Sequence, residues 1–288
     1  MSSRQAPFSQ ARRLILFHGL ASSPKEFGLI QHPLRRLGVR LECPEVPGYS
    51  HGTLDPEASW RDWVDAGVKV VQDALRADPS PFVLGGLCTG SMLALAVAAR
   101  LSEPGLQGLA LLSPLVAYDG WGLPWWYRLR PLAFALGISD RFAMSERPPY
   151  GLKNERLRQW VRSQMEGEDA TMVGPASVQL GVVRESERLS RHAVRRIPGL
   201  NLPQLVIHAR EDEICRLQSV RSAFAAARPG LLRMDVLDNS YHMITADNDR
   251  QQVAQALAEF VMHLPRAQQS AAAATLPHWP AVAVLPGT

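Results

Sequence analysis

The stretch Gly86-Leu-Cys-Thr-Gly90 places a cysteine between two glycines. An apolar run precedes it and helix-forming residues follow it, so we expect it to join a buried strand to a helix. The glycines allow a sharp corner at which the side chain of Cys88 projects from the sheet edge. A helix N-terminus and a neighbouring histidine favour the thiolate, the nucleophilic form of cysteine. The pattern predicts a cysteine nucleophile, with a structural cysteine in a βα turn as the alternative.

Two residues further along the chain could serve this nucleophile. Asp212 lies in an acidic turn after the apolar run 202–208, and His242 follows the apolar run 231–237. A histidine can accept the thiol proton and later activate water, while a carboxylate fixes the ring tautomer and stabilises the imidazolium. Each residue follows an expected strand, in the order nucleophile, acid and base. We therefore predict that Cys88, Asp212 and His242 form a catalytic triad.

Two other histidines lie near expected strand ends. His18 follows the apolar run 14–17 and precedes Gly19, which lets the backbone turn at the edge of the sheet. We expect His18 to support this turn rather than to react. His51 lies in a glycine-flanked loop where no helix or strand would fix it, so it is disfavoured as the base.

The elements that must position these residues alternate between strands and helices. Near-continuous apolar strands of this kind are typical of a parallel sheet covered by helices on both faces, so we predict an α/β fold. The expected strands are 14–17, 39–46, 82–84, 106–112, 202–208 and 231–237, and the expected helices are 59–78, 91–100, 216–227 and 247–264.

Residues 115–200 interrupt this alternation. The segment holds Trp121, Trp125 and Trp126 among prolines, and arginine-rich helices are expected within it at 153–165 and 176–195. An insertion that follows a strand's carboxyl end would cover the pocket as a helical cap, or lid, with the three tryptophans contacting substrate. Alternatively, the aromatic residues pack against one another as a small separate core, or the Trp/Arg stretch rests on a membrane surface.

Composition narrows the class of protein. The chain has 288 residues, an apolar fraction of 46% and a net charge of +4. Only three of its 31 basic residues are lysines, and the arginines are scattered rather than aligned, so nucleic-acid binding is not expected. The three cysteines form no C-x-x-C pair, so we expect neither a disulfide framework nor a metal site, and no cofactor is predicted.

The ends of the sequence and its hydropathy bear on location. Residues 1–13 contain no apolar segment of the signal-peptide type, and no apolar run reaches membrane-spanning length. We expect a soluble, cytoplasmic protein without integral membrane association. Residues 1–11 are expected to be a flexible N-terminus, and the Ala/Gln/Pro-rich residues 265–288 a disordered tail.

Together these motifs resemble the α/β-hydrolase superfamily, in particular small bacterial carboxylesterases and monoacylglycerol-lipase-like hydrolases. The resemblance covers residues 12–264, and its motifs are the corner at Cys88 and the stretches Leu14–Leu20, Pro47–Gly52, Val206–Asp212 and Ser240–Ile244. It implies an α/β-hydrolase fold with a mostly parallel eight-stranded sheet, a core of residues 12–114 and 201–264, and a helical cap at 115–200. It also implies oxyanion donors at the backbone N–H groups of Leu20 and Thr89, and action on small or medium acyl esters.

Cysteine at position 88 departs from the serine of these relatives. It resembles the G-x-C-x-G box of dienelactone hydrolases and polyhydroxyalkanoate synthases, although Ser91 follows Gly90 where the synthases have glycine. A thioester acyl-enzyme can react with water or with another acceptor. Three functions therefore stay open. They are a cysteine-dependent esterase or thioesterase, an acyltransferase or condensing enzyme with an acyl-carrier or CoA-linked donor, and a non-catalytic binder.

Overall fold

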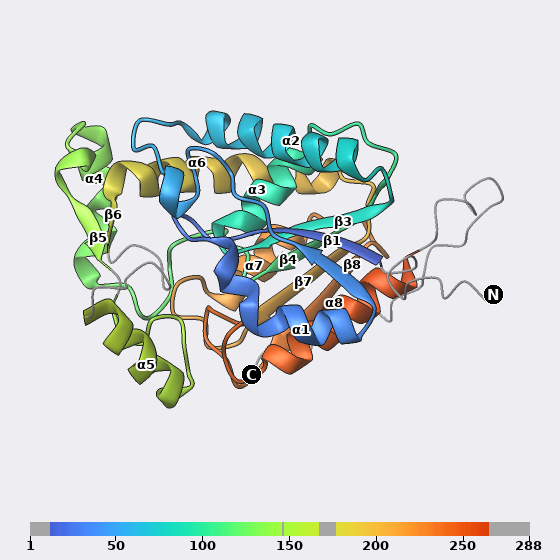
Figure 1. The fold of residues 1–288 in the computed structure, drawn as a ribbon. Helices are drawn as coiled ribbons and strands as arrows, with labels where there is room; N and C mark the ends of the chain where they lie inside the picture. Colours follow the sequence, from blue (N-terminus) through green and yellow to red (C-terminus); the bar gives the residue numbers. More distant parts are fainter. Residues whose placement is uncertain (1–11, 146, 167–176, 265–288) are drawn as a thin grey trace, which may run out of the picture.

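A parallel β-sheet forms the centre of the molecule. The computed structural model describes residues 12–145, 147–166 and 177–264, so the expectations for 1–11 and 265–288 lie outside the described residues. The strand order is β2-β1-β3-β4-β7-β8, and every neighbouring pair is parallel (Figure 1). The strands are β1 (Arg12–Phe17), β2 (Val39–Glu42), β3 (Phe82–Leu87), β4 (Leu106–Leu112), β7 (Gln204–Ala209) and β8 (Leu232–Leu237).

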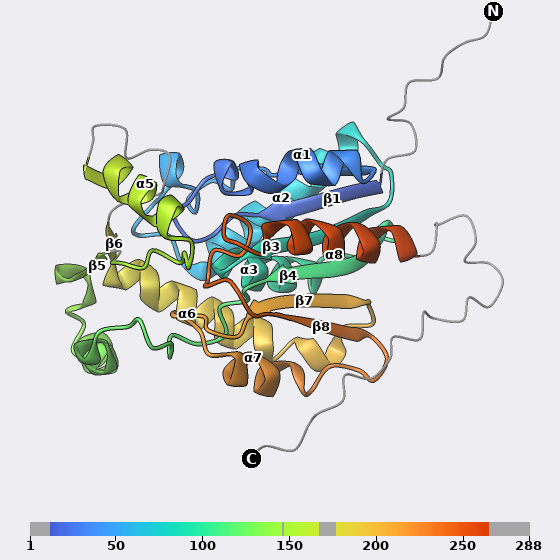
Figure 2. The same ribbon diagram turned by 90° about the horizontal axis from the view of Figure 1, so that it is seen from below.

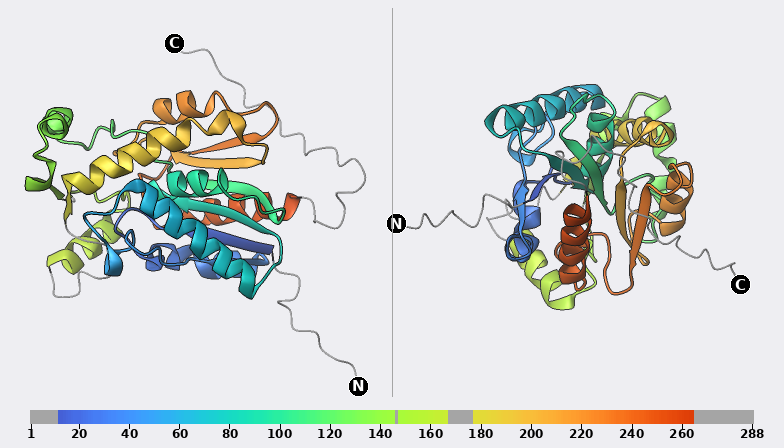
Figure 3. Two further views of the ribbon diagram at one scale, coloured as in Figure 1. Left: turned by 90° about the horizontal axis from the view of Figure 1, so that it is seen from above. Right: turned by 90° about the vertical axis from the view of Figure 1, so that its right-hand side faces the viewer.

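Helices cover both faces of this sheet, as the sequence predicts (Figures 1 and 3). Side chains alternate along each strand: Ile15 and Phe17 belong to one apolar core, and Leu14 and Leu16 to the other. Because each strand is apolar on both sides, the sheet requires two helical layers. One layer contains α2 (Trp60–Ala77), α3 (Thr89–Ala98), α6 (Leu180–Val194) and α7 (Leu217–Phe224), and the other contains α1 (Gly28–Arg36) and α8 (Arg250–His263).

The expected single sheet of eight strands is corrected. Among the described residues the central sheet has six strands, and β5 (Ala143–Ser145) and β6 (Ser177–Gln179) form a separate antiparallel pair. The apolar runs of the sequence number six, whereas the count of eight came from the resemblance. The two short strands lie within residues 115–200, so they pair with each other away from the central sheet.

The described parts of residues 115–179 lie beyond the carboxyl ends of the central strands. Figures 1 and 2 place α4, α5 and the β5/β6 pair together at that end, and α6 runs back alongside α3. The two α-helices at that end are α4 (Arg130–Ala135) and α5 (Glu155–Glu166). Elsewhere and within this segment, the described chain also has short 3₁₀ helices at Pro24–Phe27, His51–Thr53, Trp125–Leu129, Ser139–Arg141 and Ile197–Gly199.

The strand order reverses between β1 and β3, and this reversal places a crevice at their carboxyl ends. The corner after β3 packs closely against β1 there. A Cβ atom added to Gly90 would lie 2.3 Å from the carbonyl oxygens of Phe17 and His18, and one added to Gly86 would lie 2.3 Å from the carbonyl carbon of Gly90. Only glycine permits this approach of two backbone segments.

We therefore expect Gly90→Ala to lower the free energy of unfolding by about 3 kcal/mol, because the clash is with backbone rather than with a side chain that could move. Gly28→Ala is the matched control, since a Cβ there meets nothing within 4 Å. That change should be neutral or stabilising by up to about 1 kcal/mol. Urea denaturation measures both, and equal stability of the two variants would contradict the argument.

Candidate active site

Cys88 occupies the corner between β3 and α3. Its backbone has φ 58° and ψ −125°, in the left-handed region that non-glycine residues rarely adopt. Hydrogen bonds fix this conformation: the N–H of Cys88 donates to Leu112 O at 3.0 Å, and Ser91 N donates to Cys88 O at 3.1 Å. Strained backbone of this kind is typical of functional corners. The side chain faces a pocket, and its sulfur lies 3.9 Å from Oγ1 of Thr89.

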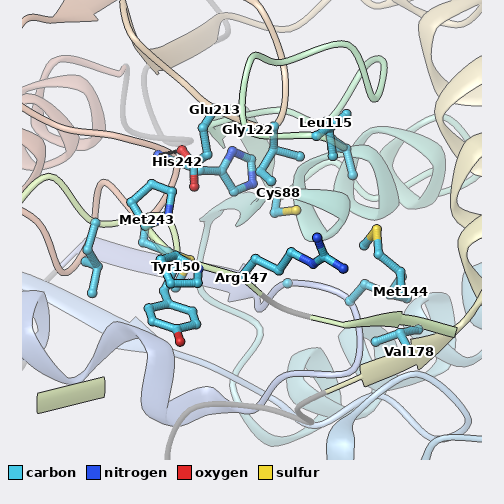
Figure 4. Close-up of a pocket in the computed structure, with 18 of the residues that line it drawn as sticks. Cys88, Leu115, Gly122, Met144, Arg147, Tyr150, Val178, Glu213, His242 and Met243 are labelled. Carbon is cyan, nitrogen blue, oxygen red and sulfur yellow. Dashed lines mark hydrogen bonds between the residues drawn. The ribbon is translucent and has the colours of Figure 1, made fainter. Parts of the chain in front are cut away.

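The structure brings His242 and Asp212 together at the same edge. Nδ1 of His242 lies 2.7 Å from Oδ2 of Asp212, and both side chains are almost fully buried. Because the carboxylate accepts this bond, Nδ1 carries the proton and Nε2 is directed elsewhere. Nε2 has no hydrogen-bond partner among the described residues, and Figure 4 shows the ring beside Cys88 on the pocket wall. Contacts of this kind often shorten only when substrate binds.

The electrostatics of the pair favour its charged form. Burial opposes a charge on His242, but the charges of Asp212 and Cys88 outweigh it and raise the pKa of the imidazole well above 6.5. Burial likewise opposes a charge on Asp212, yet the charge and hydrogen bond of His242 lower the pKa of this carboxyl below its usual 3.8. The carboxylate is therefore suited to stabilise an imidazolium.

Backbone and side-chain contacts hold the imidazole in place. Ser113, with φ 40°, donates its hydroxyl to the carbonyl of His242 at 2.7 Å. The N–H of His242 donates to Oε2 of Glu213 at 3.1 Å, and the N–H of Met243 donates to Gly151 O at 2.9 Å. The ring thus sits on a loop that is tied to three separate segments of the chain.

Asp212 is also oriented from several sides. Its Oδ1 accepts the N–H groups of Ile214 and Cys215, each at 2.9 Å. His208 lies on β7 with Nε2 at 3.6 Å from Oδ2 of Asp212 and 2.8 Å from the carbonyl of Cys215. Burial lowers the pKa of His208, so its neutral form supports the turn through hydrogen bonding.

The turn after β1 also lines the pocket. Nε2 of His18 lies 2.7 Å from Oγ of Ser50, and Tyr49 stacks on the ring and donates its hydroxyl to His18 O at 2.8 Å. Burial lowers the pKa of His18 to about 4, so the ring is neutral at pH 7. Leu20 and Thr89, the residues with the predicted oxyanion donors, both line the pocket.

Two glutamates that sequence reasoning missed also line this pocket. The N–H of Gly19 donates to Oε2 of Glu26 at 2.7 Å, and Glu213 accepts the N–H of His242. Burial raises the pKa of both carboxyls despite these hydrogen bonds, and so favours their neutral forms. No motif marks Glu26, whereas Glu213 stands next to Asp212 in the acidic turn.

Glu26 makes stability depend on pH with a defined sign. Because its folded-state pKa exceeds the usual 4.5, the unfolded chain releases the proton first and the protein loses stability as pH rises between these two values. Glu26→Gln removes that loss. We expect the Tm of Glu26→Gln to exceed that of the wild type by a few degrees more at pH 8 than at pH 5, since about 1 kcal/mol corresponds to about 2–4 °C.

Thermal unfolding at the two pH values measures this difference. Exposed Glu45 provides the control, because Glu45→Gln should change Tm little at either pH. An equal change in Tm at pH 5 and pH 8 in Glu26→Gln would show that ionisation of the buried Glu26 carboxyl does not destabilise the fold.

The pocket has a volume of about 280 Å³. Trp126 lines it, but the expectations for Trp121 and Trp125 are corrected, because neither contributes to its wall. Trp121 donates Nε1 to Glu211 O at 3.0 Å on the outer surface, and Trp125 is 77% exposed. Apolar side chains lining the pocket include Leu20, Leu115, Leu123, Trp126, Met144, Leu152, Trp160, Val161, Val178 and Ile214.

Structures of known proteins resemble this one. A monoacylglycerol lipase from Paleococcus ferrophilus has a TM-score of 0.69 at 17% identity, with 86% of this chain and 93% of that chain covered. A soluble variant of monoglyceride lipase from Saccharomyces cerevisiae, in complex with a substrate analog, gives 0.73 at 14%, covering 89% and 88%. An esterase from Exiguobacterium antarcticum gives 0.60 at 16%, covering 88% and 92%. These likenesses show the α/β-hydrolase fold.

Sequence comparison gives the family. No curated protein sequence matches this chain. In the part of the chain that the structure describes, no helix is long and apolar enough to cross a membrane. The family described as serine aminopeptidase, S33, matches residues 9–249, although this chain carries Cys88 at the corner where the resemblance places a serine. Because this match spans more than half of the 288 residues, the chain belongs to that family, within the α/β-hydrolase superfamily.

Proposed function

We propose that this protein is a cysteine-dependent hydrolase that cleaves a small or medium acyl ester or thioester through an acyl-enzyme on Cys88. The observation that carries the proposal is the position of Cys88. It stands in left-handed backbone at the start of α3, facing a pocket, beside an imidazole that Asp212 orients at 2.7 Å. A structural cysteine would need neither the pocket nor the oriented ring.

Acylation follows from this arrangement. His242 holds the proton of the Cys88 thiol at Nε2 as an imidazolium, and the thiolate sulfur attacks the substrate carbonyl to form a tetrahedral oxyanion. The N–H groups of Leu20 and Thr89 stabilise that oxyanion, and Thr89 N is free to do so because it lies in the first turn of α3. The C–O or C–S bond to the leaving group then breaks. The imidazolium returns its proton to the leaving group, and a thioester remains on Cys88.

Deacylation uses the same groups in reverse order. His242 removes a proton from water as the water attacks the thioester carbonyl, and the same two N–H groups stabilise the second oxyanion. The C–S bond breaks, the carboxylic acid leaves and the proton returns to sulfur. Burial raises the pKa of Glu26 beside the His-Gly turn, and this shift reduces the repulsion that its carboxylate would exert on the oxyanion.

Two features support the substrate class. The pocket is small and mainly apolar, which suits a short or medium acyl group. The structural relatives are named as monoglyceride lipases and an esterase, which act on esters by name.

We also propose that residues 12–114 and 201–264 form the core and that residues 115–200 form a cap, which contributes Trp126 and Met144 to the pocket.

A panel of 4-nitrophenyl esters and acyl thioesters, from acetyl to decanoyl, tests the proposal through its products. Release of free acid, with the highest kcat/KM below about eight carbons, is the expected result. An amine or thiol acceptor is added in parallel reactions. Acyl transfer that exceeds hydrolysis at low acceptor concentration would favour an acyltransferase with a carrier-linked donor. Tight binding of esters without any turnover would favour a non-catalytic binder.

A further inference from the structure

The pocket contains a cation that the proposed chemistry does not use. Among the described residues that line the pocket, Arg147 is the one lysine or arginine, and Figure 4 shows its guanidinium projecting into the hollow. No ion-pair or hydrogen-bond partner of this side chain occurs among the described residues. Arg130 in the same segment differs, since it pairs with Glu187 at 2.5 Å.

The backbone that carries Arg147 is fixed relative to the imidazole. Residues 147–152 form consecutive turns, in which Tyr150 N donates to Arg147 O at 3.0 Å. Gly151 O accepts the N–H of Met243, the residue after His242, at 2.9 Å. The carboxylate of Asp247 then accepts the N–H groups of Lys153 and Asn154 at 2.6 and 2.8 Å. The loop of His242 therefore holds the loop of Arg147 at the pocket.

Among the described residues, no carboxyl group on the pocket wall pairs with this charge. Burial favours the neutral forms of Glu26 and Glu213, and each already accepts a backbone N–H. Burial likewise keeps Tyr118 neutral, with a pKa above its ordinary value, and the charge of His242 is compensated by Asp212. Arg147 is exposed at this wall, and a guanidinium that no described carboxylate pairs with attracts an anionic group.

We propose that the pocket selects acyl substrates that carry a carboxylate, with Arg147 as the group that binds it. This inference rests on the proposed acyl-enzyme chemistry at Cys88 and adds the substrate class. A single guanidinium matches one carboxylate through two parallel hydrogen bonds, whereas a phosphate dianion usually requires several donors. Cys88 and Arg147 line the same pocket of about 280 Å³, so the proposed substrate is a short dicarboxylic monoester that would place its ester at Cys88 and its free carboxylate at Arg147.

Matched alkylating reagents test the charge preference without requiring turnover. The iodoacetyl amides of glycine, β-alanine and γ-aminobutyric acid place a carboxylate at increasing distance from the reacting carbon, and their methyl esters are the neutral counterparts. The rate of alkylation of Cys88 is followed by mass spectrometry of its peptide. We expect Arg147→Gln to lower the acid-to-ester rate ratio about fivefold at the best length, and Arg147→Glu to lower it further.

The control is Arg128→Gln, because Arg128 is exposed in the same segment and does not line the pocket. Its rate ratio should equal that of the wild type, and Arg147→Lys should recover part of the preference. An unchanged ratio in Arg147→Gln at every length, with Cys88 still reactive, would overturn this inference alone. A Cys88 that neither the acids nor the esters alkylate would instead contradict the proposed function, and the inference with it.

Discussion

Replacing Cys88 by alanine is expected to lower kcat/KM for an activated ester by about 10⁴-fold or more, because the variant cannot form the acyl-enzyme. The fold should survive, since the side chain projects into the pocket and alanine adds no atoms at the corner. Steady-state kinetics on purified protein measures the loss. Turnover in Cys88→Ala at the wild-type rate would exclude covalent catalysis at this sulfur.

Two further variants make this experiment specific. Cys43 is also a free, half-buried cysteine, but it does not line the pocket, so Cys43→Ala should retain full activity. Cys88→Ser keeps a nucleophilic atom at the corner together with His242 and both oxyanion donors. We expect this variant to hydrolyse esters measurably, which would identify the surrounding scaffold as a hydrolase independently of the sulfur.

Asp212→Asn is expected to lower kcat by about 10³–10⁴-fold while leaving KM within a few fold. An amide at this position can present its N–H₂ to Nδ1, which would favour the wrong tautomer and place the proton on Nε2. It also cannot stabilise the imidazolium. Neighbouring Glu211 is the matched control, because it pairs with Lys153 on the surface and Glu211→Gln should leave kcat unchanged. Equal activities of the two variants would remove Asp212 from the mechanism.

Asp212→Asn should also change how the free energy of unfolding depends on pH, within a window that has a lower and an upper limit. The lowered pKa of Asp212 means that the pair stabilises the fold above about pH 4 and that this stability is lost as pH falls through the folded-state value. The raised pKa of His242 adds stability below pH 6.5, which is lost as pH rises through its own folded-state value. The free-energy difference between wild type and Asp212→Asn should therefore be largest between these limits.

The sequence predicts the sheet well because its strands are buried on both faces. Runs such as 106–112 are apolar throughout, and a parallel strand is the usual element with that composition. Boundaries are less certain: the expected strand 39–46 ends at Glu42, and α6 begins at Leu180 because the preceding residues join β6. Neither limit leaves a signal in hydrophobic periodicity, since both depend on which backbone groups find partners.

The sequence likewise predicts some residues of the candidate site and misses others. Cys88, Asp212 and His242 each follow a strand, so the topology alone brings them to one edge, and the structure places His242 beside Asp212. Glu26 and Arg147 lie on loops whose positions depend on tertiary contacts, such as those of the Asp247 carboxylate, and no local pattern reveals them. Residue type alone predicts Trp121 in the pocket, whereas its side chain lies outside the pocket wall. A cytoplasmic location stays a prediction from the sequence.

Rapid acid quench during turnover of a slowly hydrolysed ester, followed by peptide mass spectrometry, tests the central claim most directly. We predict that the peptide containing Cys88 gains the mass of the acyl group, and that hydroxylamine at neutral pH removes this mass as expected for a thioester. Acylation of a different side chain, or continued turnover by Cys88→Ala with no acylated peptide, would contradict the account.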